Sequence, residues 1–141
     1  MTVASVMTKS PACCTPKSSL TDVARMMIDN DCGQIPVVED LTSHKLSGVV
    51  TDRDIATRIV AEGKNTAEAS ACDCMSTPCI SVTANTSLKS CCEMMETHKI
   101  RRMPVVDEQG SLVGIISLAD IARHTNNETT ASLIKQVSTQ S

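Results

Sequence analysis

The sequence repeats itself, and this repeat constrains the fold more than any other feature does. A shift of 68 residues places Met7 on Met75. The same shift places the Pro-Val-Val segment at 36–38 on the Pro-Val-Val segment at 104–106. Self-similarity of this length predicts two copies of one supersecondary unit, each of which needs its neighbour to bury its apolar face.

A change in the shift marks the site of a turn. Beyond the Pro-Val-Val segments the match resumes at a shift of 66 residues, so that Gly48 falls on Gly114. The adjustment lies in a polar stretch, 39–45 against 107–111, where a surface turn tolerates a difference in length. We divide the chain into a first repeat at 1–66, a second repeat at 67–126 and a polar C-terminal tail at 127–141.

Each repeat predicts the element order β-α-β-β-α. After a short extended segment, Ser19 or Ser87 can cap a helix whose apolar residues recur at i, i+3, i+4 and i+7. Two apolar strands joined by the polar turn follow, and a second helix begins at Thr51 or Ser117. The expected extended segments and strands are 12–15, 35–38 and 46–50 in the first repeat, and 80–83, 103–106 and 112–116 in the second.

One repeat is too small to bury a complete core. A unit of about 55 residues leaves one face of its sheet open to water. We therefore expect an α+β fold in which two pseudo-twofold-related units pack sheet to sheet. Two related clefts would lie between the units.

Composition excludes several classes of protein. The chain of 141 residues contains no Phe, Trp or Tyr, so it cannot build the aromatic stacking platforms of many RNA-binding and single-strand-binding domains. A net charge of −3 argues against a nonspecific nucleic-acid binder. No apolar run is long enough to span a membrane, and the N-terminus has no secretory signal. We expect a cytoplasmic protein with reduced thiols.

One motif occurs once in each repeat and resembles that of a known family. The segments 48–55 and 114–121 both read Gly-h-h-[Thr/Ser]-x-x-Asp-Ile, where h is Val or Ile. Together with the Pro-Val-Val strands, they resemble cystathionine-β-synthase (CBS) domains, and two in tandem resemble the small standalone CBS-pair proteins of prokaryotes. The resemblance implies a non-catalytic regulatory module that binds AMP, ADP or ATP, and less commonly S-adenosylmethionine or NAD.

The motif also has chemistry of its own. A strand that ends in Thr or Ser and opens a helix presents backbone N–H groups and a hydroxyl to an anion, and a carboxylate can accept both hydroxyls of a ribose. By resemblance, Asp54 and Asp120 would hold the ribose, and Thr51 and Ser117 would contact the phosphate. The same spacing also forms a capping box, which accounts for the motif without any ligand.

Basic residues precede the second Pro-Val-Val strand. By resemblance, Arg101 and Arg102 would reach a phosphate bound mainly by the other repeat, and so share a cleft with Thr51 and Asp54. The second cleft has only Arg53 as a partial substitute, so we expect the two clefts to differ in affinity for charged nucleotides. The alternative is that these arginines are ordinary solvated surface charges.

An adenine would have to bind without aromatic rings. By resemblance it would lie between aliphatic side chains and use nearby backbone groups. The residues expected around it are Ala12, Cys14 and Ile35 in one cleft, and Ile80, Val82 and Met103 in the other.

The eight cysteines offer an alternative chemistry. Several, such as Cys91 and Cys92, align with apolar residues of the other repeat and are expected to be small core residues. None has the spacing of a structural zinc site, so no metal ligand is assigned. A thiol or metal-based redox sensor, with Cys13, Cys72, Cys74 and Cys79 as a spatial cluster, stays an alternative.

Catalysis and assembly complete the expectations. No nucleophile, base or phosphate-loop motif appears, so we predict no enzyme. By resemblance we expect a homodimer that acts on an unknown protein partner. The candidates for its contact, or for the core, are the apolar helix residues Ile55, Ile59, Val60, Ile121 and Ala122. A ligand-free dimerisation module is the remaining alternative.

Overall fold

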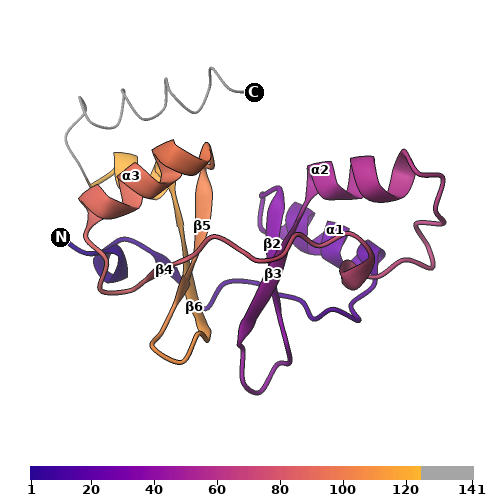
Figure 1. Cartoon of the computed structure of the whole chain (residues 1–141), viewed down its shortest axis with the longest axis horizontal. Helices are drawn as coiled ribbons and strands as arrows, with labels where there is room; N and C mark the ends of the chain where they lie inside the picture. The colour runs from indigo at the N-terminus through magenta and orange to yellow at the C-terminus, as the bar shows by residue number, and fades with distance from the viewer. Residues whose placement is uncertain (125–141) are drawn as a thin grey trace. The chain divides into compact units, whose positions relative to one another are not determined.

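The computed structural model describes residues 1–124 and has a mixed α+β fold (Figure 1). The predicted polar tail at 127–141 lies outside the described residues. The helices are α1 Leu20–Asp29, α2 Asp52–Ile55, α3 Leu88–His98 and α4 Leu118–Ala122. The strands are β1 Thr8–Lys9, β2 Gln34–Val38, β3 Leu46–Thr51, β4 Val82–Thr83, β5 Arg102–Val106 and β6 Leu112–Ser117.

The predicted helices and hairpin strands are confirmed in both repeats, and the helix starts fall where the serines predicted them. The leading segment predicted at 12–15 forms no strand and contributes one isolated bridge, between Cys14 and Val37, whereas the sequence analysis did not predict β1. Ser19 accepts a hydrogen bond from the Asp22 N–H and begins α1. Ser87 accepts one from the Ser90 N–H and begins α3. After α2 the helix continues as a π-helical segment, Ala56–Val60. Among the described residues, every helix is too short or too polar to cross a bilayer.

The polypeptide forms two compact units, and each combines segments of both sequence repeats. Among the described residues, unit 1 contains Met1–Pro11, Ile80–Glu108 and 112–124. Unit 2 contains Ala12–Cys79 and Gln109–Ser111. The repeat boundaries at 66 and 67 therefore describe the period of the sequence, whereas the compact units are divided differently.

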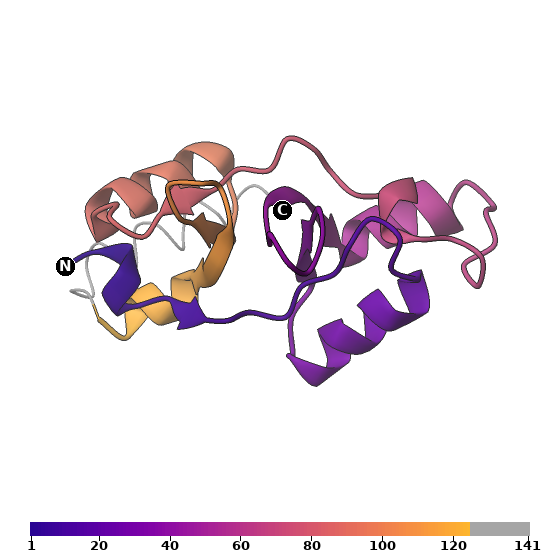
Figure 2. The same cartoon turned by 90° about the horizontal axis from the view of Figure 1, so that it is seen from below.

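Hydrogen bonds in the sheets account for this exchange. In unit 1, β1, the short indigo arrow in Figure 2, pairs antiparallel with β6. Thr8 lies opposite Ile115 in this pairing. The four strands of that sheet have the order β1-β6-β5-β4. In unit 2, Ser76 pairs antiparallel with Val49 of β3, which is the repeat-equivalent contact. The start of each repeat thus completes the sheet that contains the hairpin of the other repeat.

Glycine permits this close pairing in both units. A Cβ atom on Gly48 would lie 2.6 Å from the carbonyl oxygen of Ser76. A Cβ atom on Gly114 would lie 2.6 Å from the sulfur of Met7 and 3.0 Å from the carbonyl oxygen of Thr8. The glycine of the repeated motif is therefore needed for the leading segment to approach the strand.

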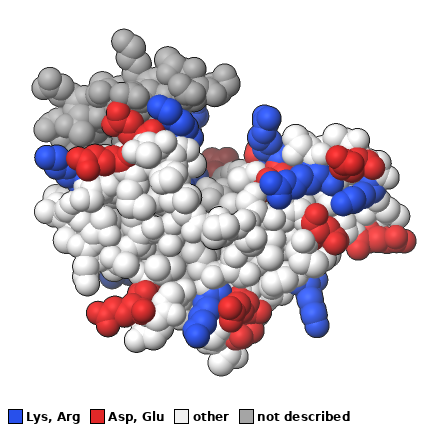
Figure 3. All heavy atoms as spheres, in the orientation of Figure 1, with Lys and Arg blue, Asp and Glu red and all other residues white. Residues whose placement is uncertain are grey.

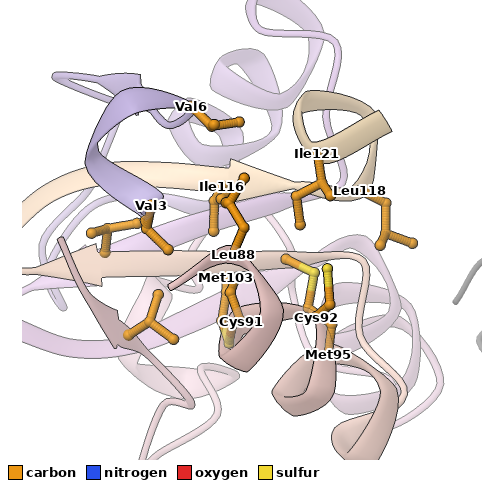
Figure 4. Close-up of a cluster of buried hydrophobic side chains, with 12 residues drawn as sticks. Val3, Val6, Leu88, Cys91, Cys92, Met95, Met103, Ile116, Leu118 and Ile121 are labelled. Carbon is orange, nitrogen blue, oxygen red and sulfur yellow. The ribbon is translucent and has the colours of Figure 1, made fainter. Parts of the chain in front are cut away.

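Each unit has its own apolar core. In unit 1, the side chains of α3 point toward those of β5, β6 and α4, and Val3 and Val6 of the N-terminal segment join the same cluster (Figure 4). In unit 2, α1 packs on β2 and β3 in an equivalent cluster. Cys91 and Cys92 lie in the first core and Cys14 and Cys74 in the second, as expected for small apolar residues.

The helix positions considered for a dimer contact divide between core and surface. Ile59 and Ile121 are fully buried in the two cores, so a role for these two as exposed contacts is wrong. The reason is that Ile59 packs in the core that contains α1, β2 and β3, and Ile121 packs in the core that contains α3, β5 and β6. Val60 remains 59% exposed.

We predict that Val3→Ala destabilises unit 1 selectively. Val3 is fully buried in the core that contains β5 and β6. Removing two buried carbon atoms and leaving a cavity should cost about 2 kcal/mol. Amide hydrogen exchange should accelerate in β5 and β6 more than in β2 and β3. A greater loss of protection in β2 and β3 would contradict the exchange of leading segments.

Candidate ligand site at the helix caps

The site in unit 2 is built at the junction of β3 and α2. Thr51 ends the strand in an extended conformation, and its hydroxyl accepts a hydrogen bond from the Asp54 N–H at 3.0 Å. The Asp54 carboxylate in turn accepts one from the Thr51 N–H at 3.0 Å. This reciprocal capping box fixes the carboxylate beside the end of the strand.

Unit 1 has the same arrangement at the junction of β6 and α4. The Ser117 hydroxyl accepts from the Asp120 N–H at 3.1 Å, and the Asp120 carboxylate accepts from the Ser117 N–H at 3.1 Å. Asp54 and Asp120 are both only 9% exposed. The capping interpretation of the repeated Thr/Ser-x-x-Asp spacing is therefore confirmed.

One oxygen of each carboxylate has further partners that the sequence analysis missed. Asp54 Oδ1 accepts a hydrogen bond from the Ser76 hydroxyl at 3.3 Å and lies 3.8 Å from Arg58 Nε. Asp120 Oδ1 accepts one from Arg123 Nη2 at 2.7 Å. The arginines follow their aspartates by four and three residues, a spacing that could have signalled these ion pairs. Ser76 had no such local signal.

The backbone donors at the start of α2 are not free, so that part of the predicted anion site is wrong. The Asp52 N–H donates to the Gly33 carbonyl at 2.9 Å, and the Arg53 N–H donates to the Asp52 carboxylate at 2.8 Å. The next donor, of Asp54, is taken by the capping hydroxyl of Thr51. At α4 the Leu118 N–H similarly donates to the Arg101 carbonyl at 3.0 Å.

Within unit 1, the structure brings the predicted basic residues close to the cap. Arg102 begins β5 directly opposite Ser117, and the backbone of Arg101 binds Leu118 at the first position of α4. The side chain of Arg101 is exposed. That Arg101 and Arg102 bind a phosphate together with Thr51 and Asp54, which belong to unit 2, stays a prediction.

The residues predicted around adenine divide into buried and accessible groups. Cys14 is 2% exposed, and both of its backbone groups bind β2, through Pro36 and Val38. Of the predicted residues, Ile35, Val82 and Met103 are also buried. Ala12 is half-buried and Ile80 is 38% exposed. These last two are therefore the members of the set whose side chains a ligand reaches most directly.

Burial suppresses the reactivity of most cysteines. It raises the pKa of Cys14 to about 12, with a further contribution from Cys13 and Cys74, and it raises the pKa of Cys91 to about 12. It raises the pKa of Cys79 to about 11. Within residues 1–124, no group of three or more His, Cys, Asp or Glu residues is placed to hold a metal ion. The buried thiols are therefore poor nucleophiles near neutral pH.

Charge does not mark a nucleic-acid surface on the face seen in Figure 3. On that face, acidic and basic side chains of the described residues are interspersed and do not form one basic area. Nonspecific binders of nucleic acid present a basic surface to the phosphates. The repeated caps are therefore the better candidates for a ligand site.

The repeated fold and its paired caps define a protein with two related α+β units. A CBS domain model matches residues 3–61 and again residues 71–127, and the chain belongs to the CBS-domain family. It is 37% identical over 139 residues to the CBS domain-containing protein YhcV of Bacillus subtilis, covering 98% of this chain and 96% of that protein. Hypoxic response protein 1 of Mycobacterium tuberculosis is 33% identical over 136 residues, covering 96% and 93%.

Solved structures show the same fold. Hypoxic Response Protein I, with two coordinated zinc ions, matches with a TM-score of 0.80 at 35% identity, over 89% of this chain and 100% of that chain. CBSX2 in complex with AMP matches with a TM-score of 0.74 at 27% identity, over 95% and 98%. The CBS domain pair of MJ0100, in complex with 5′-methylthioadenosine and S-adenosyl-L-methionine, matches with a TM-score of 0.73 at 26% identity, over 87% and 94%.

We predict that alkylation by iodoacetamide separates the exposed cysteine from the buried ones. A thiol with a pKa near 12 is about one part in ten thousand thiolate at pH 8, and the thiolate is the reactive form. Cys72 is exposed and should react first, whereas Cys14 and Cys91 should react only slowly. Their rates should rise about tenfold per pH unit between pH 8 and 10. Mass spectrometry of digested protein measures this, with denatured protein as the control, and equal rates at pH 8 would contradict it.

Proposed function

We propose that the chain is a non-catalytic regulatory module that binds an adenosine-containing ligand, of the AMP, ADP or ATP class, at Asp54 and Asp120. The observation that carries the proposal is the duplicated cap, which holds a nearly buried carboxylate at the same strand-to-helix junction in each unit. Relatives of the same fold were solved with AMP, or with 5′-methylthioadenosine and S-adenosyl-L-methionine.

Capping and binding are chemically compatible. An ionised carboxylate offers about four lone-pair sites, and the capping N–H uses one of them. The remaining sites suit two neighbouring hydroxyls, which a ribose presents as a cis-diol. The capping hydroxyls of Thr51 and Ser117 act as acceptors toward the Asp N–H groups, so their own O–H groups remain to donate to a phosphate oxygen.

Positive charge near the caps supports a phosphorylated ligand. Arg102 lies opposite Ser117, and Arg101 adjoins it. Arg53 is the basic residue next to Asp54, where it is accompanied by the acidic Asp52. Because charge-assisted hydrogen bonds to phosphate are strong, we propose that the ligand contacts Arg101 or Arg102 and that the two sites differ in affinity for charged nucleotides.

A ligand-free interaction module is the second candidate function. It is favoured by one observation: the capping boxes are complete without any ligand. Ligand titration distinguishes the two functions.

We predict that AMP raises the melting temperature of the wild-type chain and that Asp54→Ala and Asp120→Ala each remove part of this shift. A one-site ligand at 100 times its dissociation constant stabilises by about 2.7 kcal/mol. The melting temperature of each variant is compared with and without AMP, so that the stability lost with the cap is the same in both measurements. The double variant should show no shift.

Asp73→Ala is the matched control. Asp73 forms a capping box of the same kind with Ser70, whose N–H donates to the Asp73 carboxylate at 2.8 Å. This variant should lose cap stability but keep the full response to AMP. If the double variant at Asp54 and Asp120 also keeps that response, the proposed site is wrong. If the wild-type chain responds to no adenosine compound, the ligand-free module is favoured.

We also propose that the chain is a homodimer and that its helices supply part of the contact. The exposed Val60 lies at the end of the π-helical segment that follows α2. Val60→Asp should shift the sedimentation coefficient toward that of a monomer, because a buried unpaired charge opposes association. Leu41→Asp, at a position that is 64% exposed in the β2–β3 turn, should not. A monomeric wild-type chain would contradict the proposal.

A further inference from the structure

The carboxylate of Asp54 is tied to a distant segment of unit 2. The Ser76 hydroxyl lies 3.3 Å from Oδ1 and 3.4 Å from Oδ2 of Asp54. Arg58 lies 3.8 Å from Oδ1 through Nε, while its Nη1 donates to the carbonyls of Cys74 and Met75 at 3.3 and 3.2 Å. Two side chains therefore link this carboxylate to the segment that ends unit 2.

The equivalent carboxylate of unit 1 has no such link. Asp120 binds Arg123, which belongs to the same helical turn and also donates to the Ala119 carbonyl. The residue equivalent to Ser76 is Thr8 in β1. Among the interactions described for residues 1–124, its hydroxyl makes no hydrogen bond to Asp120. Thr8 thus provides a matched control position within the same chain.

Counting acceptor sites shows what a bound ribose would displace. A carboxylate accepts about four hydrogen bonds. On Asp54 the Thr51 N–H occupies one at 3.0 Å, and the Ser76 hydroxyl covers one site on each oxygen at 3.3 and 3.4 Å. Arg58 Nε lies beside Oδ1 at an ion-pair distance of 3.8 Å. A cis-diol needs two. The short capping bond stays, and the weaker contacts of Ser76 and Arg58 give way.

We propose that Ser76 and Arg58 form a latch that a ribose cis-diol displaces from Asp54. The inference rests on the proposed function and adds to it that binding at the unit 2 site competes with side-chain contacts from a distant segment, whereas binding at the unit 1 site does not. The backbone pairing of Ser76 with Val49, at 2.8 and 3.1 Å, is independent of the latch and keeps the segment in place. The change is therefore local to the side chains and to the carbonyls that Arg58 holds.

Calorimetric titration with AMP tests the competition. In an Asp120→Ala background, in which only the unit 2 site remains, Ser76→Ala should tighten AMP binding by roughly threefold to tenfold, the worth of one hydrogen bond. Arg58→Gln should change the affinity in the same direction. Thr8→Ala should leave it unchanged. Unchanged or weaker binding by both Ser76→Ala and Arg58→Gln overturns the latch.

The 2′-deoxy form of AMP, which lacks the cis-diol, tests which group displaces the latch. In the same Asp120→Ala background, Ser76→Ala should tighten binding of AMP more than binding of 2′-deoxy-AMP. An equal gain for both ligands overturns the latch.

The two proposals fail differently. If Asp54→Ala abolishes AMP binding while Ser76→Ala and Arg58→Gln have no effect, the proposed function stands and the latch is wrong. If neither the wild-type chain nor Ser76→Ala binds AMP, both are wrong.

Discussion

The structure depends on the backbone pairing between the leading segment of each repeat and the sheet of the other. Thr8 pairs with the strand that contains Gly114, and Ser76 pairs with the strand that contains Gly48. In both places the absence of a Cβ atom allows the close approach. The two cores follow from this pairing, because it brings Val3 under the sheet of unit 1 and Cys74 under that of unit 2.

The same strand whose glycine admits the leading segment ends at the cap that we assign to a ligand. Three residues after Gly48 comes Thr51, and three residues after Gly114 comes Ser117. Pairing, capping and the position of the acidic side chain are therefore set by one stretch of eight residues in each repeat. A short motif of this kind can serve folding and binding together, since the cap holds the carboxylate still and leaves acceptor sites on it.

Local features of the fold could be predicted from the sequence, and non-local ones could not. The apolar period of α1 and α3, their capping serines and the capping boxes depend on residues within one or two turns. Whether Ile59 and Ile121 are buried depends on which side of a short helix packs on the sheet. Whether the Asp52 N–H at the start of α2 is free depends on the carbonyl of Gly33, which accepts its hydrogen bond. The contact of Ser76 with Asp54 joins residues that are 22 positions apart, so no local sequence pattern predicts it.

Because the edge segments are exchanged, the sequence repeat and the compact unit consist of different residues. A polypeptide cut between residues 66 and 67 would leave β6 without β1 and would leave Val49 without the strand edge that Ser76 supplies. Neither fragment would carry a complete sheet, and each would expose an unpaired edge that invites aggregation. Each half therefore needs a segment of the other repeat to complete its sheet.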